Sequence, residues 1–201
     1  MATRIFLIRH GTALGAENRA VGQVDLPLSP RGADDLSRLA ASWDGPPPDV
    51  LFASDLERAW ASANVLSEAW EQPVRQDQRL REISFGVWDG RPWDHIERQD
   101  GARFRGWMAR WWQDTVPGGE SFDGVAARAN EWLDQMLDDY RDGTVAAVAH
   151  GGSIRGILGR VLGMPTEKAF NLYLDHGRVS CVATGRHGLE VVLTNGDRFP
   201  P

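Results

Sequence analysis

The sequence has a single cysteine, Cys181, among its 201 residues. It can therefore form neither an internal disulfide nor a cysteine metal site, and this scarcity is typical of proteins in a reducing cytoplasm. Long apolar segments are also missing. No stretch approaches the roughly 20 residues of a membrane-spanning helix, and the N-terminus lacks the apolar run and cleavage site of a signal peptide. We therefore expect a cytoplasmic protein that makes no membrane contact.

An excess of positive charge is absent as well. The formal net charge is -6 and the pI is about 5.4, which argues against a nucleic-acid partner, because such a protein would show a basic face. A local arginine cluster can still override the global sign, so an anionic small substrate stays compatible with this composition. Hydrophobic residues make up 42% and charged residues 25% of the chain, as in an ordinary globular protein. The length suits a single domain spanning residues 1–201.

Apolar runs and helix signals alternate along the chain. Apolar runs predict buried strands at 3–9, 50–54 and 143–150, and a further pair of strands is expected near 178–184 and 189–194. Apolar periodicity, a Ser-Pro helix start and a glycine-opened segment predict helices over 29–43, 55–70, 121–140 and 151–163. This alternation predicts an α/β fold: a three-layer α/β/α sandwich with a mostly parallel central sheet.

Polar residues follow the buried strands at their ends. The first strand leads into Arg9 and His10, and the third leads into His150 and two glycines. Ligands of an open α/β sheet bind beyond the carboxyl ends of its parallel strands, so these side chains are expected to meet at one edge. Arg58, about one turn into the helix after the second strand, can lean over the same edge. Two arginines, two histidines and a helix N-terminus form a pocket suited to phosphate.

Tryptophan is the one residue in unusual supply, with nine copies. Between residues 87 and 120 the pattern is irregular and aromatic, and Phe104, Trp107, Met108 and Trp111 share one face of a helix by their spacing. We expect a short, helical, Trp-rich insertion at about residues 87–120 near the phosphate pocket. Tryptophans usually fill cores and pockets, and any that are exposed would favour a homodimer.

Five segments of the chain can be compared with known motifs: LIRHG (7–11), GQVDLPLSPRG (22–32), FASDLERAWASANVL (52–66), LREISFGVWDGRPWDHI (80–96) and VAHGGSIRGIL (148–158). Together they resemble the motifs of the histidine phosphatase superfamily, also called the phosphoglycerate-mutase-like family. A lone RHG tripeptide would be weak evidence, but all five segments occur in the family's order and at compatible intervals, nearly end to end.

The resemblance implies a role for each matching residue. His10 would be the nucleophile that takes the phosphoryl group onto a ring nitrogen, and Arg9, Arg58 and His150 would hold the phosphoryl oxygens. Glu82 would be the general acid for the leaving oxygen and then the base for water, a role that alternates between protonated and ionised carboxyl. The resemblance implies no metal and no other cofactor, because the arginines supply the positive charge.

Substrate contacts follow from the same resemblance. Gly11 and Gly151 belong to the phosphate-binding motifs, and Asn18 stands near the place where many members carry a phosphate-contacting asparagine. Segments 85–96 and 116–134 look most like those of α-ribazole-5'-phosphate phosphatases. In such an enzyme, Trp88, Trp93 and Trp107 would line a pocket and stack against the aromatic base of the substrate.

Departures from the family pattern leave the substrate open. Thr12-Ala13 stands where the family often has Glu-Thr, and Val21 stands where it often has Gln. A phosphosugar or a phosphoglycerate-type ester is as compatible with the sequence as α-ribazole 5'-phosphate. A phosphatase is favoured over a phosphoglycerate mutase, because only about thirty residues separate Gly90 from the PGGES segment. It is favoured over a non-catalytic binding module because no key histidine or arginine is lost.

The other histidines and the cysteine are interpreted as residues without a catalytic role. His95, His176 and His187 are predicted to be surface or hydrogen-bonded polar residues, and Cys181 a small core residue. For Glu82, the structural alternative to catalysis is an ion pair with a neighbouring arginine, either Arg79 or Arg81.

Overall fold

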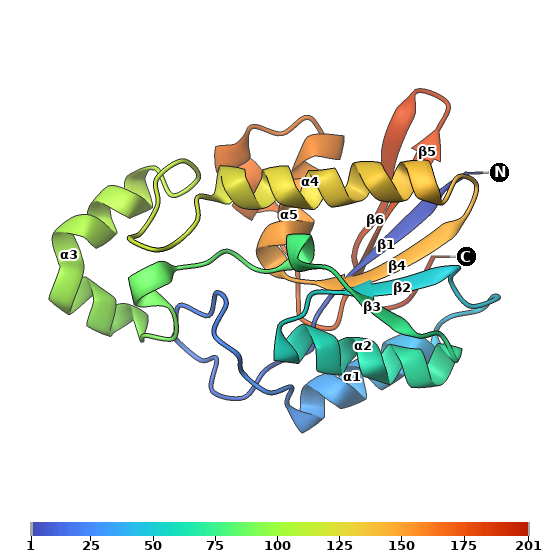
Figure 1. The fold of residues 1–201 in the computed structure, drawn as a ribbon, viewed down its shortest axis with the longest axis horizontal. Coiled ribbons are helices and arrows are strands. Elements are labelled where there is room, and N and C mark those ends of the chain that lie inside the picture. Colours follow the sequence, from blue (N-terminus) through green and yellow to red (C-terminus); the bar gives the residue numbers. More distant parts are fainter. Residues whose placement is uncertain (1, 201) are drawn as a thin grey trace.

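The computed structural model describes residues 2–200, which form one six-stranded sheet with helices on both faces (Figure 1). The strands lie in the order β3-β2-β4-β1-β5-β6. The first four in this order run parallel, whereas β5 pairs antiparallel with both β1 and β6. The predicted mostly parallel sheet is confirmed. The strands are β1 (Arg4–Arg9), β2 (Val50–Ala53), β3 (Val74–Gln76), β4 (Thr144–Ala149), β5 (Val179–Gly185) and β6 (Gly188–Gly196).

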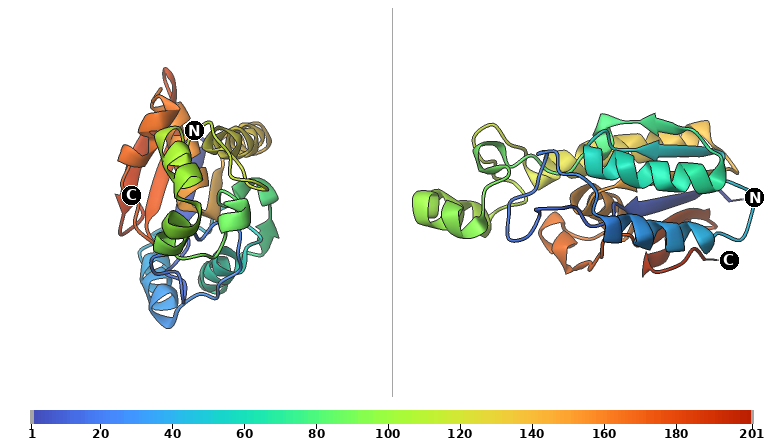
Figure 2. Two further views of the ribbon diagram at one scale, coloured as in Figure 1. Left: turned by 90° about the vertical axis from the view of Figure 1, so that its left-hand side faces the viewer. Right: turned by 90° about the horizontal axis from the view of Figure 1, so that it is seen from below.

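A pair of helices covers each face of the sheet (Figures 1 and 2). The helices α1 (Pro30–Ala41) and α2 (Glu57–Trp70) lie on one face, and α4 (Phe122–Asp139) and α5 (Gly151–Val161) lie on the other. This arrangement is the three-layer sandwich that the sequence predicts. Short 3-10 helices complete the regular structure: η1 (Gln78–Leu80), η2 (Gly86–Trp88) and η3 (Thr166–Asn171).

The strand β1 illustrates why its apolar run is continuous. Ile5 and Leu7 pack in the core beneath α4 and α5, whereas Phe6 and Ile8 pack in the core beneath α1 and α2. Successive side chains of a strand point to opposite faces of the sheet, so a strand covered on both sides must be apolar at every position. Each of these buried side chains contributes roughly 1.5–3 kcal/mol to folding. The predicted burial of this strand on both faces is confirmed.

Local capping signals set the helix starts on both faces. The Ser29 hydroxyl accepts a hydrogen bond from Gly32 N at the start of α1, and Pro30 occupies the first turn as predicted. At the start of α4, the Ser121 hydroxyl accepts one from Gly124 N in the same way. Each side chain satisfies a backbone donor that the helix itself cannot.

The Trp-rich segment forms a separate helical layer at one end of the molecule, opposite the end where N and C are marked (Figure 1). Its helix, α3 (Trp93–Ala109), has a non-helical backbone at Asp100. The helix ends before Trp111, and Met108 is largely exposed, so the predicted four-residue face is only partly helical. The segment has a small core of its own, formed by Ala20, Trp88, Ile96 and Val116.

The carboxyl ends of β1, β2 and β4 lie at the edge of the sheet that faces this helical layer (Figure 1). Because β5 runs antiparallel to β1, the start of β5, and not its end, lies at that edge. Among residues 2–200, the structure has no helix with the length and apolar character needed to cross a membrane.

Candidate active site

The ends of β1 and β4 bring two histidines together. Arg9 pairs with Ala149 in the parallel register, and His10 N donates a hydrogen bond to Ala149 O at 3.0 Å. The ring centroids of His10 and His150 are 4.9 Å apart, and both residues are buried. The structure thus places side by side the two histidines that follow buried strands in the sequence.

Two hydrogen bonds define the state of the His10 ring. Its Nδ1 lies 2.7 Å from Gly11 O, and its Nε2 lies 3.2 Å from Arg58 Nε. A carbonyl oxygen only accepts and a guanidinium N–H only donates, so Nδ1 carries the proton and Nε2 presents its lone pair. Burial, followed by the charge of Arg58, lowers the pKa of His10 well below its usual range. The ring is therefore neutral at physiological pH, with an unprotonated Nε2.

Arg58 is a buried cation held by backbone carbonyls. Its Nη1 donates to Val24 O at 3.0 Å and its Nη2 donates to Gly22 O at 2.7 Å. The Asp89 carboxylate holds this backbone in turn, by accepting from the N–H groups of Gly22 and Gln23. Within residues 2–200, Arg58 forms no ion pair with a carboxylate. A buried cation without a counter-ion favours an anionic ligand.

Arg9 supplies a second cation at the same edge. Its Nη1 donates to Leu174 O at 2.5 Å, whereas its buried Nε has no hydrogen-bond partner among the residues that the structure describes. The Arg9 guanidinium also lies beside the backbone of Gly151, at the start of α5. Two arginines therefore converge near His10, and Arg9 retains a donor that is free to bind an anion.

His150 is more deeply buried than His10. Both of its ring nitrogens lack a hydrogen-bond partner within residues 2–200, and the ring does not line the cavity described below. Burial, followed by the proximity of His10, lowers the pKa of His150 well below its usual range. Buried polar atoms without a partner are unfavourable, so the ring has capacity to donate to a ligand that reaches it.

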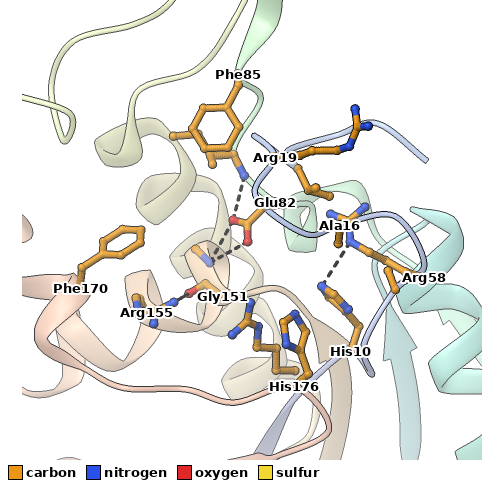
Figure 3. A pocket seen from close by; sticks show the side chains of 15 residues that line it. His10, Ala16, Arg19, Arg58, Glu82, Phe85, Gly151, Arg155, Phe170 and His176 are labelled. Carbon is orange, nitrogen blue, oxygen red and sulfur yellow. Dashed lines mark hydrogen bonds between the residues drawn. The ribbon is translucent and has the colours of Figure 1, made fainter. Parts of the chain in front are cut away.

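Glu82 lies over the start of α5. Its Oε1 accepts hydrogen bonds from Ile83 N and Gly152 N, both at 3.0 Å, and its Oε2 accepts from Gly152 N at 3.2 Å (Figure 3). A Cβ atom at position 152 would overlap Glu82 Oε1. Glycine is therefore required at this position for the carboxylate to approach the helix N-terminus.

The backbone around Glu82 is held by Arg128 of α4. The Arg128 guanidinium donates to the carbonyl oxygens of Arg79, Arg81 and Glu82 at 2.7–3.0 Å. It also forms an ion pair with Glu120 at 2.8 Å. Arg128 therefore fixes the segment that carries the Glu82 carboxylate.

The structural alternative for Glu82 is wrong. Arg79 forms its ion pair with Asp77, and Arg81 forms its ion pair with Asp55. Both neighbouring arginines thus form ion pairs with other carboxylates. The Glu82 side chain instead contacts backbone N–H groups and lines the cavity.

These residues surround a cavity of about 250 Å³ (Figure 3). Five of the predicted site residues line it: Arg9, His10, Arg58, Glu82 and Gly151. Its lining includes four arginines but only one carboxylate, that of Glu82, so the cavity is electrostatically suited to a dianion. Within residues 2–200, the structure has no group of three or more His, Cys, Asp or Glu side chains that could hold a metal ion.

Further residues of the lining were not predicted as site residues, among them Arg19, Arg155, Phe170 and His176. Arg155 Nη1 donates to Gly151 O at 3.1 Å, and the Arg155 guanidinium lies 4.7 Å from the Phe170 ring centroid. Arg19 reaches the cavity from the loop after β1. His176, which the sequence predicts to be a surface or hydrogen-bonded polar residue, also lines the cavity, and its ring centroid lies 5.0 Å from that of His10.

Five predicted substrate-binding residues do not line this cavity: Gly11, Asn18, Trp88, Trp93 and Trp107. Asn18 is exposed, and its backbone oxygen accepts a hydrogen bond from Trp93 N. Trp88 lies in the core of the helical layer, where its indole N–H donates to Asp100, so it is too buried to stack on a substrate. Gly11 is buried against α1, but its carbonyl oxygen orients the His10 ring.

Trp107 lies in a second, apolar pocket that adjoins the first. This pocket has a volume of about 280 Å³ and is lined by Ile83, Phe85, Trp107, Met108, Trp111 and Phe170. Three of these residues, Ile83, Phe85 and Phe170, also line the cavity around His10. The polar cavity and the apolar pocket therefore share a wall beside Glu82.

Comparison with known proteins connects this site to a family. Residues 5–197 match the profile of the histidine phosphatase superfamily (branch 1). The adenosylcobalamin/α-ribazole phosphatase of Escherichia coli (strain K12) is 26% identical over 180 residues, which cover 89% of each chain. The glucosyl-3-phosphoglycerate phosphatase of Mycolicibacterium vanbaalenii is 36% identical over 177 residues, covering 82% of this chain and 76% of the relative. The crystal structure of the α-ribazole phosphatase from Shigella flexneri superposes with a TM-score of 0.89 at 24% identity and 98% coverage of both chains, which supports the same fold.

Proposed function

The chain belongs to the histidine phosphatase superfamily, and we propose that it is a metal-independent phosphomonoesterase that acts on a small phosphorylated metabolite through a phosphohistidine at His10. The observation that carries this proposal is the state of the His10 ring. Nδ1 is held as the donor by Gly11 O, and the Nε2 lone pair faces the guanidinium of Arg58 beside a cationic cavity. This is the arrangement that a nitrogen nucleophile for phosphorus requires.

In the first half of the reaction, His10 Nε2 attacks phosphorus while the bond to the ester oxygen breaks. The electron pair of that bond moves to the leaving oxygen, which takes a proton from the Glu82 carboxyl group. Arg9, Arg58 and His150 stabilise the charge on the phosphoryl oxygens. The arginines thus supply the positive charge that a metal ion provides in other phosphatases.

In the second half, the ionised Glu82 removes a proton from water as the water oxygen attacks the phosphorus of phospho-His10. The nitrogen–phosphorus bond breaks and returns its electron pair to Nε2. Inorganic phosphate leaves, and Glu82 is again protonated for the next substrate. One carboxyl group serves both halves because the leaving oxygen and the attacking water occupy the same side of phosphorus.

α-Ribazole 5'-phosphate is our first candidate substrate. The apolar pocket around Trp107, Trp111 and Phe170 adjoins the cavity at Glu82, the residue that protonates the leaving oxygen. An aromatic base attached through the leaving group would fit such a pocket. Kinship with an α-ribazole phosphatase supports the same candidate.

A second candidate is an acidic phosphosugar such as glucosyl-3-phosphoglycerate. Arg19 and Arg155 line the cavity in addition to Arg9 and Arg58, and a single phosphoryl group does not need four guanidinium groups. A substrate carboxylate would use the two outer arginines. The 36% identity to a glucosyl-3-phosphoglycerate phosphatase supports this candidate. A phosphoglycerate mutase is the alternative reaction, in which a second hydroxyl replaces water.

The first experiment measures phosphate release from p-nitrophenyl phosphate in EDTA by the wild type, His10→Ala and the control His95→Ala, whose side chain is exposed on α3. We expect EDTA-resistant activity that only His10→Ala abolishes. Equal activity in all three proteins would contradict the nucleophile assignment. The two candidate substrates are then compared by kcat/KM, and transfer to a second hydroxyl without phosphate release would identify a mutase.

A further inference from the structure

His176 stands in the turn that precedes β5, and this turn is fastened to the end of β1. Gly177 N donates to Arg9 O at 3.0 Å and to His10 O at 3.2 Å. Asp175 N, on the other side of His176, donates to Asn195 Oδ1. The backbone therefore fixes His176 beside the proposed nucleophile, and its side chain lies next to His10 in the cavity lining (Figure 3).

No hydrogen bond of the His176 ring within residues 2–200 accounts for its position. It is half-buried, and neither ring nitrogen makes a hydrogen bond to any residue within 2–200. Its one specific contact is with the His10 ring, at 5.0 Å between centroids and 56° between planes. A polar ring in this state normally finds a partner, and His176 lines the cavity around His10 as well as a second cavity beside Asp175 and Arg178.

The surroundings of His176 keep its ring neutral. Burial, followed by the charge of Arg9, lowers the pKa of His176 to about 4, against the opposing effect of the Asp175 carboxylate. Arg58 is the other cation that acts on the ring, in the same direction as Arg9. A neutral imidazole has one N–H donor and one acceptor nitrogen, so the ring can donate to an anion without carrying a charge of its own.

We propose that His176 belongs to the phosphoryl-binding site and donates its ring N–H to a phosphoryl oxygen, both in the substrate complex and in phospho-His10. This inference rests on the phosphoryl chemistry proposed above. A transferring phosphoryl group spreads its charge over three equatorial oxygens. Arg9 and Arg58 bring charged donors to them, and His176 adds a neutral donor from the antiparallel half of the sheet.

The test is the binding of orthovanadate, measured by isothermal titration calorimetry at pH 7. Three variants are compared with the wild type: His176→Phe keeps a planar ring without a donor, whereas His176→Asn and His176→Gln each restore an N–H donor at a different reach. His187→Phe, at an exposed position in the β5–β6 turn, is the matched control. We expect His176→Phe to raise the Kd about 10- to 100-fold, the range for a hydrogen bond to a charged group. We expect at least one amide variant to stay within about threefold of the wild type.

The variants distinguish failure of the His176 proposal from failure of the phosphatase proposal. A Kd for His176→Phe within twofold of the wild type would overturn the role of His176 while leaving the phosphatase proposal intact. An equal loss of orthovanadate affinity in all three variants would also overturn the role of His176, because binding would then depend on the shape of the side chain and not on its N–H donor. Failure of the wild type to bind orthovanadate would overturn both proposals. Orthovanadate binding without any phosphatase activity would overturn only the catalytic one.

A second measurement covers the case in which His176→Phe does not fold. The ring nitrogens of His176 are observed by nitrogen-15 NMR in the wild-type protein, with and without orthovanadate. The proposal requires one ring nitrogen of His176 to shift on binding. Unchanged resonances of His176, in a sample where those of His10 shift, would refute it.

Discussion

Replacing Gly152 by alanine should disable the general acid while leaving the nucleophile in place. The Gly152 N–H donates to both carboxylate oxygens of Glu82, at 3.0 and 3.2 Å, and an added Cβ would overlap Oε1. The side chain that must move is flexible and lies at the cavity wall, so Glu82 gives way while the backbone of α5 stays. The carboxylate is then displaced by about 1 Å from its productive position.

The size of the effect depends on the leaving group. A misplacement of about 1 Å costs about 100-fold in rate, and a positioned acid supplies about 10²–10⁴ in total. We therefore expect kcat/KM for an alkyl phosphate to fall about 100-fold in Gly152→Ala. For p-nitrophenyl phosphate we expect less than about a threefold change, because p-nitrophenolate leaves without a proton. Because kcat/KM reports only the steps up to formation of phospho-His10, the later use of Glu82 as a base does not affect the comparison of the two esters.

Gly159→Ala is the matched control on the same helix. A Cβ at this position meets no atom within 4 Å, so both kcat/KM values should stay unchanged. Stability should rise by up to about 1 kcal/mol from the better helix propensity of alanine. Equal losses of kcat/KM on the two esters in Gly152→Ala would refute the reasoning, because a missing general acid penalises only the poorer leaving group.

Three other outcomes test the surroundings of the site. Arg128→Met removes the donors that hold the backbone before Glu82, and we expect roughly a tenfold lower kcat/KM on an alkyl phosphate with an unchanged Kd for inorganic phosphate; a weaker Kd would mean a general collapse of the cavity. Phe170→Ala should raise KM for an aromatic phosphate ester roughly two- to tenfold and leave a methyl ester unaffected, while Leu162→Ala, an exposed control, should change neither. The pKa of histidine is near 6.5 in the unfolded chain, whereas the pKa of His176 in the folded protein is about 4. Between these pH values the unfolded chain binds more protons than the folded protein. The free energy of unfolding should therefore fall as the pH drops from 6.5 to 4. The limit for this one group is about 3 kcal/mol before solvent screening, and urea titrations of His176→Asn should show a shallower fall than the wild type.

The fold could be predicted because its signals are local. The run Ile5–Ile8 is apolar at every position, as a strand between two helical layers must be. Ser29 and Ser121 cap helices through their own hydroxyl groups. The residues at strand ends could also be predicted to converge, since parallel strands finish at a common edge.

Long-range geometry explains what the sequence could not predict. The position of His176 beside His10 could not be predicted, because His176 precedes a strand instead of following one. Only the antiparallel direction of β5 brings the start of that strand toward His10. Trp88 has the same periodic and aromatic character as a pocket residue. It is a core residue because its indole N–H finds Asp100, at the non-helical point of α3. The local sequence pattern predicts neither the direction of a strand nor a hydrogen-bond partner twelve residues away.

The motifs depend on one another, and this is why five of them together indicate more than any one. The Glu82 and Arg58 side chains are each oriented by backbone groups that belong to a different motif. Glu82 rests on the N–H of Gly152, and Arg58 rests on the carbonyl oxygens of Gly22 and Val24. The His10 ring receives its orientation from both Gly11 and Arg58. A substitution in the segment 22–24 should therefore change the orientation of His10 through Arg58. A substitution at Gly152 should instead change the position of Glu82. We therefore expect mutations to separate the proposed nucleophile from the proposed general acid.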